Sequence, residues 1–209
     1  MSLSSMLRSI VLAGCRMVLW VYAETEMEGV ERIPEKGAVL IVANHRSLAD
    51  PPLIALSTKR PIYFMGKSEL FSAPLAAWIL RNILVFPVNP RSADRKAIRH
   101  AESLLRAGEA VCMFPEGQLT ETGEMQDMSG GALMISLHTQ APILPIGLIG
   151  TEAIVPYGSL KPQRAWSKIK LRVGKLIPPT VLTGGMEGRE ALRHGMRYLK
   201  DELSKLTKD

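Results

Sequence analysis

The sequence predicts an α/β fold in which helices cover a central sheet. Short apolar runs, bounded by glycine, proline or polar residues, alternate along the chain with longer segments whose apolar residues recur every three or four positions. The short runs are typical of buried strands and the longer segments of amphipathic helices. Because the two alternate in a chain of 209 residues, of which 46% are hydrophobic, we expect one layered domain with a sizeable core.

Residues 1–24 differ from the rest and predict an amphipathic, membrane-associating helix ahead of a domain that comprises residues 25–209. Apolar side chains recur at spacings of three and four, and Arg8 and Arg16 fall opposite them. The helix either packs its apolar stripe on the domain or lies in a membrane interface, with Trp20 among the lipid headgroups. We expect the helix to be too short, and too interrupted by the two arginines, to span a bilayer, which takes about 20 mostly apolar residues.

Residues 37–43 are continuously apolar and predict a buried strand, after which Asn44 and His45 follow directly. Asp50 precedes two prolines and predicts the start of a helix, because Asp is a favoured N-cap and proline is favoured in the first turn. The sequence thus places a histidine at the end of a strand and a carboxylate at the start of a helix, about one turn apart.

The alternation continues through the middle and the end of the chain. Further strands are expected over residues 61–65, 85–88, 110–114 and 143–149, and further helices over residues 74–82, 93–107, 129–140 and 187–206. Residues 168–173 alternate charged and apolar side chains, which predicts a half-exposed strand at an edge of the sheet.

The formal net charge of +6 favours an anionic partner. Aromatic residues make up only 5% and no run alternates them with basic residues, so nucleic acid is not expected. The basic stretch 161–172 contains Trp166 and no acidic residue, which favours an anionic membrane surface. Cys15 and Cys112 do not indicate a disulfide framework, which favours a reducing compartment.

His45 and Asp50 supply two members of a hydrolase triad. The carboxylate can orient one imidazole nitrogen while the other acts as general base. Ser47 lies close, but no nucleophile-elbow pattern surrounds it. A pair without its own nucleophile suits direct acyl transfer, in which the substrate supplies the hydroxyl; a hydrolase that uses Ser47, or a plain loop histidine and helix cap, are the alternatives. The other histidines lack ligand spacing, so no metal is expected.

Glu116 and Gly117 form a second polar cluster, at the end of the strand predicted over residues 110–114. The carboxylate can accept hydrogen bonds from a substrate hydroxyl or from backbone N–H groups. Gly117 lacks the side chain that would block the approach of a ligand to the backbone. A structural turn is the alternative interpretation.

Four blocks of this sequence resemble, in order, the signature blocks of the glycerolipid acyltransferases, the family of the 1-acyl-glycerol-3-phosphate acyltransferases. They are residues 44–50 (NHRSLAD), 85–91 (VFPVNPR), 114–117 (FPEG) and 143–146 (ILPI). The resemblance implies a glycerol-phosphate-acyltransferase-like sheet flanked by helices. It also implies transfer of an acyl chain from acyl-CoA or acyl carrier protein to the free hydroxyl of lysophosphatidate, which is a lysophospholipid. No cofactor is implied. Such a protein would be peripheral or monotopic on the cytoplasmic side of the cell membrane.

The resemblance further implies roles for single residues. His45 would be the general base and Asp50 its orienting partner. Arg91 would hold the acceptor phosphate, since a guanidinium pairs with it in bidentate fashion. Glu116 and Gly117 would line the acceptor site, and Pro145 would shape the acyl side. Lys67 is a second phosphate candidate by charge and position, or else a solvated lysine.

Two departures from the family pattern concern the acceptor. Many family members carry an arginine shortly after the Glu-Gly pair, where this chain has Gln118, Leu119 and Thr120. An acidic residue usually precedes the arginine of the second block, where this chain has Pro90 before Arg91. The alternatives are therefore an acyltransferase for another lysolipid or an amino-lipid, and a non-catalytic membrane-binding domain of the same fold.

Overall fold

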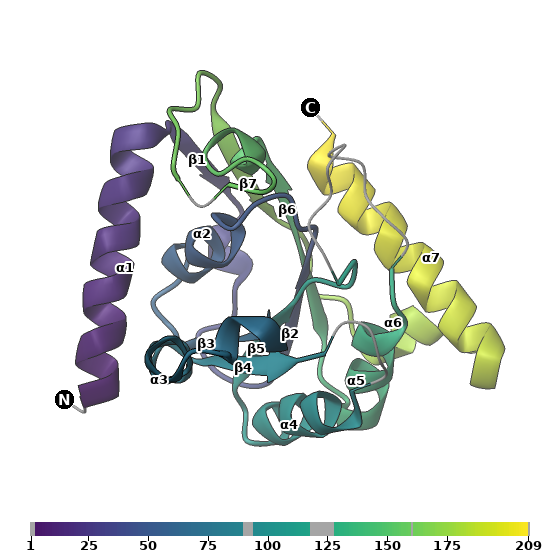
Figure 1. Ribbon diagram of the computed structural model, residues 1–209. Helices are drawn as coiled ribbons and strands as arrows, with labels where there is room; N and C mark the ends of the chain where they lie inside the picture. The colour runs from purple at the N-terminus through teal and green to yellow at the C-terminus, as the bar shows by residue number, and fades with distance from the viewer. Residues whose placement is uncertain (1–2, 90–93, 118–127, 160, 209) are drawn as a thin grey trace.

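The computed structural model describes residues 3–89, 94–117, 128–159 and 161–208 (Figure 1). In these ranges seven strands form one sheet in the order β1-β7-β6-β2-β5-β3-β4. The strands are β1 (Thr25–Glu28), β2 (Val39–Ala43), β3 (Ile62–Lys67), β4 (Val85–Val88), β5 (Ala110–Met113), β6 (Ile143–Ile149) and β7 (Ile169–Val173). The α-helices are α1 (Leu3–Tyr22), α2 (Asp50–Leu56), α3 (Pro74–Asn82), α4 (Arg95–Arg106), α5 (Gly131–Thr139), α6 (Pro179–Thr183) and α7 (Gly188–Thr207), and the 3-10 turns are η1 (Val30–Arg32), η2 (Ser68–Phe71) and η3 (Thr151–Ala153).

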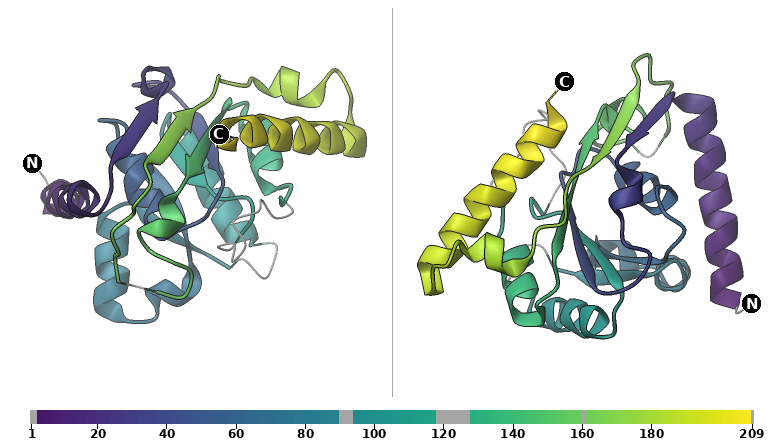
Figure 2. Two further views of the ribbon diagram at one scale, coloured as in Figure 1. Left: turned by 90° about the horizontal axis from the view of Figure 1, so that it is seen from above. Right: turned by 180° about the vertical axis from the view of Figure 1, so that it is seen from behind.

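Helices cover both faces of the sheet, with α1 and α2 on one face and α4 to α7 on the other (Figures 1 and 2). Alternate residues of β2 contribute to the two cores. Ile41 packs in the core that contains Leu53 of α2, and Leu40 packs in the core that contains Leu133 of α5 and Leu199 of α7. The α/β architecture predicted from the alternating pattern is confirmed.

The central strand β2 is buried on both faces, and each of its five residues is 0% exposed. It pairs in parallel with β5 and with β6. A strand covered on both sides needs apolar residues at every position, which explains the unbroken run in the sequence.

The motifs that contain His45 and Glu116 collect at one edge of the sheet because the strands that precede them share a direction. Strands β2 to β6 are linked by parallel pairings. Their carboxyl ends therefore meet at the same edge, which is where open parallel sheets bind ligands. We call it the carboxyl edge.

At the opposite edge, where the parallel strands start, one side chain holds several segments together by hydrogen bonds. The guanidinium of Arg60, just before β3, donates to the backbone carbonyls of Pro34 at 2.7 Å, Gly37 at 3.0 Å and Gly108 at 3.2 Å. Pro34 and Gly37 precede β2, and Gly108 precedes β5. Burial lowers the pKa of Arg60. The ordinary pKa of an arginine is so high that the group nevertheless keeps its charge. One cation thus fixes the starts of three neighbouring strands.

The expectation that residues 168–173 form an edge strand was wrong. β7 lies between β6, with which it is antiparallel, and β1, with which it is parallel. The alternating pattern was right about exposure, since Lys170 and Arg172 are half-buried between buried neighbours. β1 takes the edge, and its short polar sequence predicted no strand.

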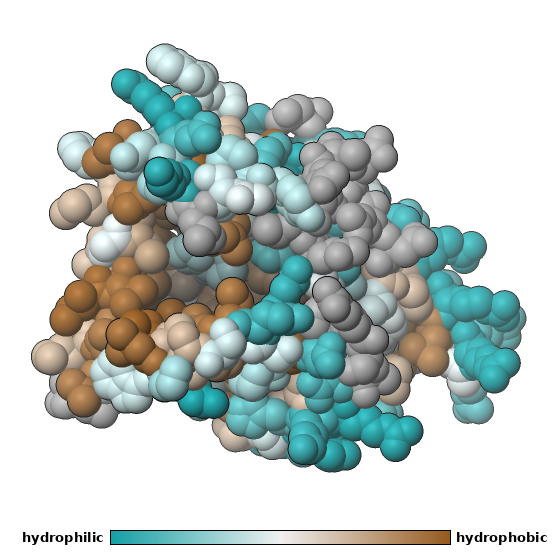
Figure 3. Space-filling view, viewed as in Figure 1, coloured by the Kyte–Doolittle hydropathy of each residue, from teal (hydrophilic) through white to brown (hydrophobic). Residues whose placement is uncertain are grey.

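Helix α1 lies along one side of the molecule, and Leu19 is its one buried residue (Figure 1). By length and composition alone it is apolar enough to cross a membrane, so the expectation that it is too short was wrong. The two arginines leave enough apolar residues around them. Hydrophobic side chains also gather over α1 and α3 on the face shown in Figure 3. The exposed members include Met6 and Ile10 of α1 and Leu75 and Trp78 of α3.

Candidate active site

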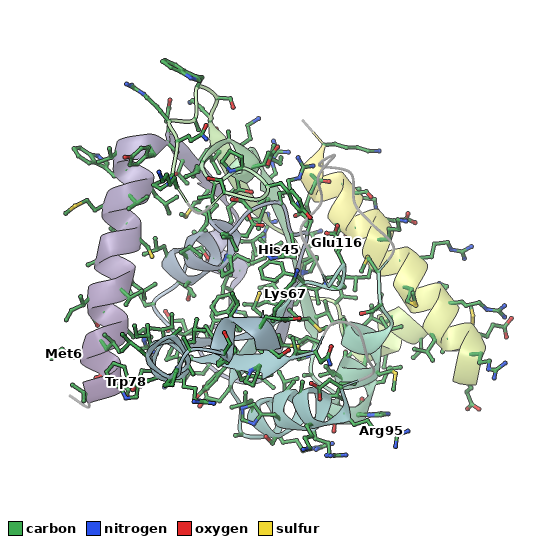
Figure 4. The ribbon with its side chains drawn as sticks, viewed as in Figure 1. Met6, His45, Lys67, Trp78, Arg95 and Glu116 are labelled. Atoms are coloured by element: carbon green, nitrogen blue, oxygen red, sulfur yellow. The ribbon has the colours of Figure 1, made fainter. Side chains whose placement is uncertain are left out.

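His45 and Asp50 lie at the carboxyl edge, between the end of β2 and the first turn of α2 (Figure 4). Nδ1 of His45 is 2.9 Å from Oδ2 of Asp50. The side chain of Asp50 is 0% exposed and that of His45 is 14% exposed. Because an ionised carboxylate can only accept, we assign the ring hydrogen to Nδ1, which leaves a lone pair on Nε2. The geometry thus provides an oriented base.

Asp50 also fixes the backbone that carries the histidine. Its Oδ2 accepts the N–H of Arg46 at 2.7 Å and that of Ser47 at 2.8 Å, in addition to the imidazole. The expectation that Asp50 caps α2 was wrong. It is the first residue of the helix, Ala49 takes the cap position and no side chain caps this helix. The carboxylate turns back because three donors converge there.

Glu116 joins the second cluster to the first. Its Oε1 accepts the backbone N–H of His45 at 3.0 Å, and the residue is only 8% exposed. The ring of Phe114 stacks on the imidazole, with centroids 4.0 Å apart and planes 17° apart. Parallel pairing of β2 with β5 makes both contacts possible. The stacking contact was missed from the sequence, although Phe114 stands in the same block as Glu116.

Two further residues of the same loop hold it against β6 and η3. The Asn44 side chain donates to the carbonyl of Leu148 at 2.9 Å and accepts its N–H at 2.8 Å. The Arg46 guanidinium lies 3.2 Å from Oε1 of Glu152. These positioning residues were not assigned from the sequence. For Asn44 the signal was present, because a polar residue follows directly on a buried strand.

Neither Ser47 nor Cys112 is positioned to attack a substrate. The Ser47 hydroxyl is buried, donates to the carbonyl of Val155 at 2.9 Å and accepts the N–H of Ala49. Cys112 is 0% exposed, as expected for a core residue. Burial, with a smaller effect of Asp50, raises the pKa of its thiol. The neutral thiol is a poor nucleophile, so the geometry suits attack by a hydroxyl that arrives with the substrate.

The remaining predicted site residues lie at different distances from the dyad. Lys67 ends β3 at the carboxyl edge and is exposed, and Figure 4 shows it in the same region as His45. Gly117 has φ of +70° in a turn closed by its N–H and the carbonyl of Phe114. Pro145 is buried within β6, where a Cβ on Gly174 would touch it, so its contact with an acyl chain stays a prediction. Arg91 lies outside the described residues.

The carboxyl edge brings together groups that could serve general-base chemistry. Within the ranges that the structure describes, no three His, Cys, Asp or Glu side chains are grouped closely enough to hold a metal ion. The site instead combines a histidine–carboxylate pair, a second buried carboxylate and a lysine at the same edge.

Comparison with known proteins identifies the family of this chain. Residues 24–149, well over half of the chain, match the Acyltransferase family model. The chain therefore belongs to the acyltransferase family, as the four sequence blocks predicted.

Named relatives agree with this family. The chloroplastic 1-acyl-sn-glycerol-3-phosphate acyltransferase of Brassica napus is 30% identical over 145 residues, which cover 68% of this chain and 42% of that protein. The 1-acyl-sn-glycerol-3-phosphate acyltransferase of Pseudomonas aeruginosa is 26% identical over 193 residues, 88% of this chain and 71% of that protein. The crystal structure of the lysophosphatidate acyltransferase PlsC from Thermotoga maritima superposes with a TM-score of 0.73 at 28% identity, covering 95% of this chain and 80% of that one. This structural similarity confirms the predicted fold. The chain spans only about two fifths of the length of the plant relative.

Proposed function

We propose that this protein transfers an acyl chain from acyl-CoA or acyl carrier protein to the free hydroxyl of 1-acyl-glycerol-3-phosphate, giving phosphatidate. The observation that carries the proposal is the contact between His45 Nδ1 and Asp50 Oδ2 at the carboxyl edge. The relatives named as 1-acyl-sn-glycerol-3-phosphate acyltransferases support the choice of acceptor.

In the proposed reaction, Nε2 of His45 takes the proton from the acceptor hydroxyl as the oxygen attacks the thioester carbonyl. The C–S bond breaks, the new ester C–O bond remains, and the imidazolium returns its proton to the leaving thiolate. Asp50 stabilises the imidazolium that forms between these steps. Glu116 holds the backbone of His45, so the base keeps its position throughout.

The acceptor phosphate would be held by Lys67 and Arg91, with Glu116 and Gly117 lining the acceptor site and Pro145 shaping the acyl side. Lys67 supports this by its place at the carboxyl edge. The charge of a lysine suits a phosphate, and the planar fork of an arginine binds it in bidentate fashion.

A second candidate is acyl transfer to another lysolipid, including one with an amine headgroup. The absence of an arginine at positions 118–120, directly after the Glu-Gly pair, favours it. A non-catalytic role of the fold is disfavoured, because the histidine and its buried carboxylate are both present and in contact.

We further propose that residues 1–24 associate the domain with the cytoplasmic side of the cell membrane, as a peripheral or monotopic protein. The exposed apolar side chains of α1 and α3 support this, since both substrate and product are lipids. Trp20, 82% exposed, lies near the end of α1 and is of the type that prefers lipid headgroups.

The test is His45→Ala with Ser47→Ala as its matched control. We expect thiol release from acyl-CoA in the presence of lysophosphatidate to fall about 10²–10⁴-fold in H45A, because the general base is lost. S47A should retain most of the rate, because that hydroxyl forms hydrogen bonds with the backbone of Val155 and Ala49. An unchanged rate in H45A contradicts the mechanism. Loss of activity in S47A, with a labelled acyl-enzyme in the wild type, would instead indicate a hydrolase.

The acceptor is tested separately with a panel of lysolipids that differ only in headgroup. We expect lysophosphatidate to give the highest kcat/KM. A wild-type protein that is silent with lysophosphatidate but active with an amine-bearing lysolipid would overturn the acceptor and leave the mechanism standing.

A further inference from the structure

A cavity of about 870 Å³ lies where the end of α1 meets β1 and the loop before β7. Figures 1 and 2 show this junction at the end of α1 that is far from the N-terminus. Two backbone hydrogen bonds of 2.8 Å fix its walls, from Ala165 N to Tyr22 O and from Ile169 N to Glu24 O. Leu19 and Ala165, which line it, are both buried. The cavity is therefore held in place by contacts with the core.

The charges around the cavity are mainly positive. Arg16, Arg164 and Lys168 line it together with one carboxylate, Glu24. Lys168 Nζ is 2.9 Å from Glu24 Oε1, and this hydrogen bond raises the pKa of the lysine. Among the described residues no ion pair is found for Arg16 or Arg164. Two guanidinium groups are thus available to an anion, and their planar forks match a phosphate.

Two tryptophans border the same cavity. Trp20 is 82% exposed and Trp166 is 91% exposed. The guanidinium of Arg164 lies 5.5 Å from the ring of Trp166. Indole rings beside cations are typical of protein surfaces at the depth of lipid headgroups, because the ring is apolar while its N–H and the cation remain hydrated.

The cavity is separate from the candidate active site. Its lining includes none of His45, Asp50, Glu116 and Lys67. The headgroup of a ligand bound there would accordingly not contact the dyad.

We propose that this cavity binds the phosphate-bearing headgroup of an anionic membrane phospholipid, held by Arg16 and Arg164 between the two tryptophan rings. The site lies at the end of the helix whose apolar residues face outward, so one membrane surface reaches both. Binding there would select membranes rich in anionic phospholipid, beyond the general attraction of a basic protein.

The test compares Arg16→Gln/Arg164→Gln with Arg193→Gln/Arg197→Gln in the full chain. The control pair removes the same charge from exposed positions of α7. Partitioning is measured onto phosphatidylcholine vesicles that contain phosphatidylglycerol, or oleate at matched surface charge. We expect the R16Q/R164Q protein to bind the phosphatidylglycerol vesicles at least about 25-fold more weakly. The control should change less than about twofold, and wild type should prefer phosphatidylglycerol to oleate.

Equal loss in both double variants, or equal wild-type binding to the two kinds of vesicle, would overturn the site in favour of general electrostatics. Arg16→Lys/Arg164→Lys keeps the charge without the fork, so its preference for phosphatidylglycerol should be smaller than that of the wild type; an undiminished preference would overturn the role of the guanidinium fork. The assay measures binding, and the His45→Ala protein should behave as wild type in it. Its outcome is thus independent of the proposed acyl transfer.

Discussion

At the scale of single residues, His45 is held by three contacts of different kinds. Asp50 fixes the ring through Nδ1, Phe114 covers one face of the ring, and Glu116 holds the backbone N–H. Each contact restrains a different freedom of the side chain or main chain. The folded protein thus holds the imidazole in one orientation, as the proposed general-base step requires.

Asp50→Asn should separate the charge of this residue from its hydrogen bonds. Asparagine keeps an oxygen for the N–H groups of Arg46 and Ser47, but it cannot stabilise an imidazolium. We expect thiol release to fall about 10²–10⁴-fold. The loss of stability should be limited to about 1–3 kcal/mol, because the amide NH2 would take the place of Oδ1, which is buried without a partner. Asp50→Ala should be equally inactive and also less stable, because each buried donor left without a partner costs about 1–3 kcal/mol. Urea unfolding measures the second effect, and wild-type activity in D50N would rule out a role for the carboxylate.

The sequence was informative about this site only where its residues are close in the chain. His45 and Asp50 are five positions apart, and a strand followed by a helix is enough to bring them together. The hydrogen bond between His45 and Glu116 joins residues 71 positions apart. It depends on β2 lying beside β5, a strand order that no local pattern contains.

At the scale of elements, the buried strands and the longer helices were predicted, and the polar edge strand β1 was not. α3 runs from Pro74 to Asn82 as expected, since proline favours a first turn. β1 is Thr-Glu-Met-Glu, which has no strand pattern of its own. Its register sets Glu26 opposite Lys170 and Glu28 opposite Arg172. Pairing of opposite charges across the two strands supports it, and only the partner strand reveals this.

The start of α4 gives a pH-dependent prediction. Asp94 caps the helix by accepting the N–H groups of Lys96 at 3.0 Å and Ala97 at 3.1 Å. The hydrogen bond from Ala97, foremost among several, lowers the pKa of Asp94. A folded-state pKa below the unfolded value means that this stabilisation is present above the unfolded pKa and is lost as the pH falls through the folded pKa.

Asp94→Ala should therefore destabilise the protein by about 0.5–2 kcal/mol at neutral pH, and the difference from wild type should shrink toward about pH 3. Asp94→Asn is the control, because an asparagine cap keeps the acceptor without the titrating group. Urea unfolding at both pH values measures the effect. A difference between D94A and wild type that stays constant with pH would contradict this role of the carboxylate.

At the scale of the whole molecule, α1 lies on the outside of the domain, against α2 and α3, with few of its side chains buried. Residues 3–15 include no buried side chain, and Leu19 is the residue that enters the core. A helix as short as residues 3–15 is marginal in water when it is isolated. Its exposed apolar residues are the ones that the proposed membrane association would cover.

Deletion of residues 2–15 should remove membrane capture without unfolding the domain. Leu19 and the cavity residues remain, so we expect little change in the free energy of unfolding. Recovery with phosphatidylcholine vesicles in flotation should fall at least about tenfold, because the deletion removes the exposed Met6 and Ile10. The full-length Arg193→Gln/Arg197→Gln protein should float as wild type does. Equal flotation of the deleted and full-length chains would contradict a membrane role for α1.

The tie made by Arg60 has a consequence for how this enzyme can evolve. One guanidinium joins the starts of β2, β3 and β5 at the edge of the sheet opposite the dyad. Part of the stability is therefore located away from the residues that meet the substrate. Segments at the carboxyl edge can then vary in sequence without disturbing this tie. In this way one scaffold can carry sites of different specificity.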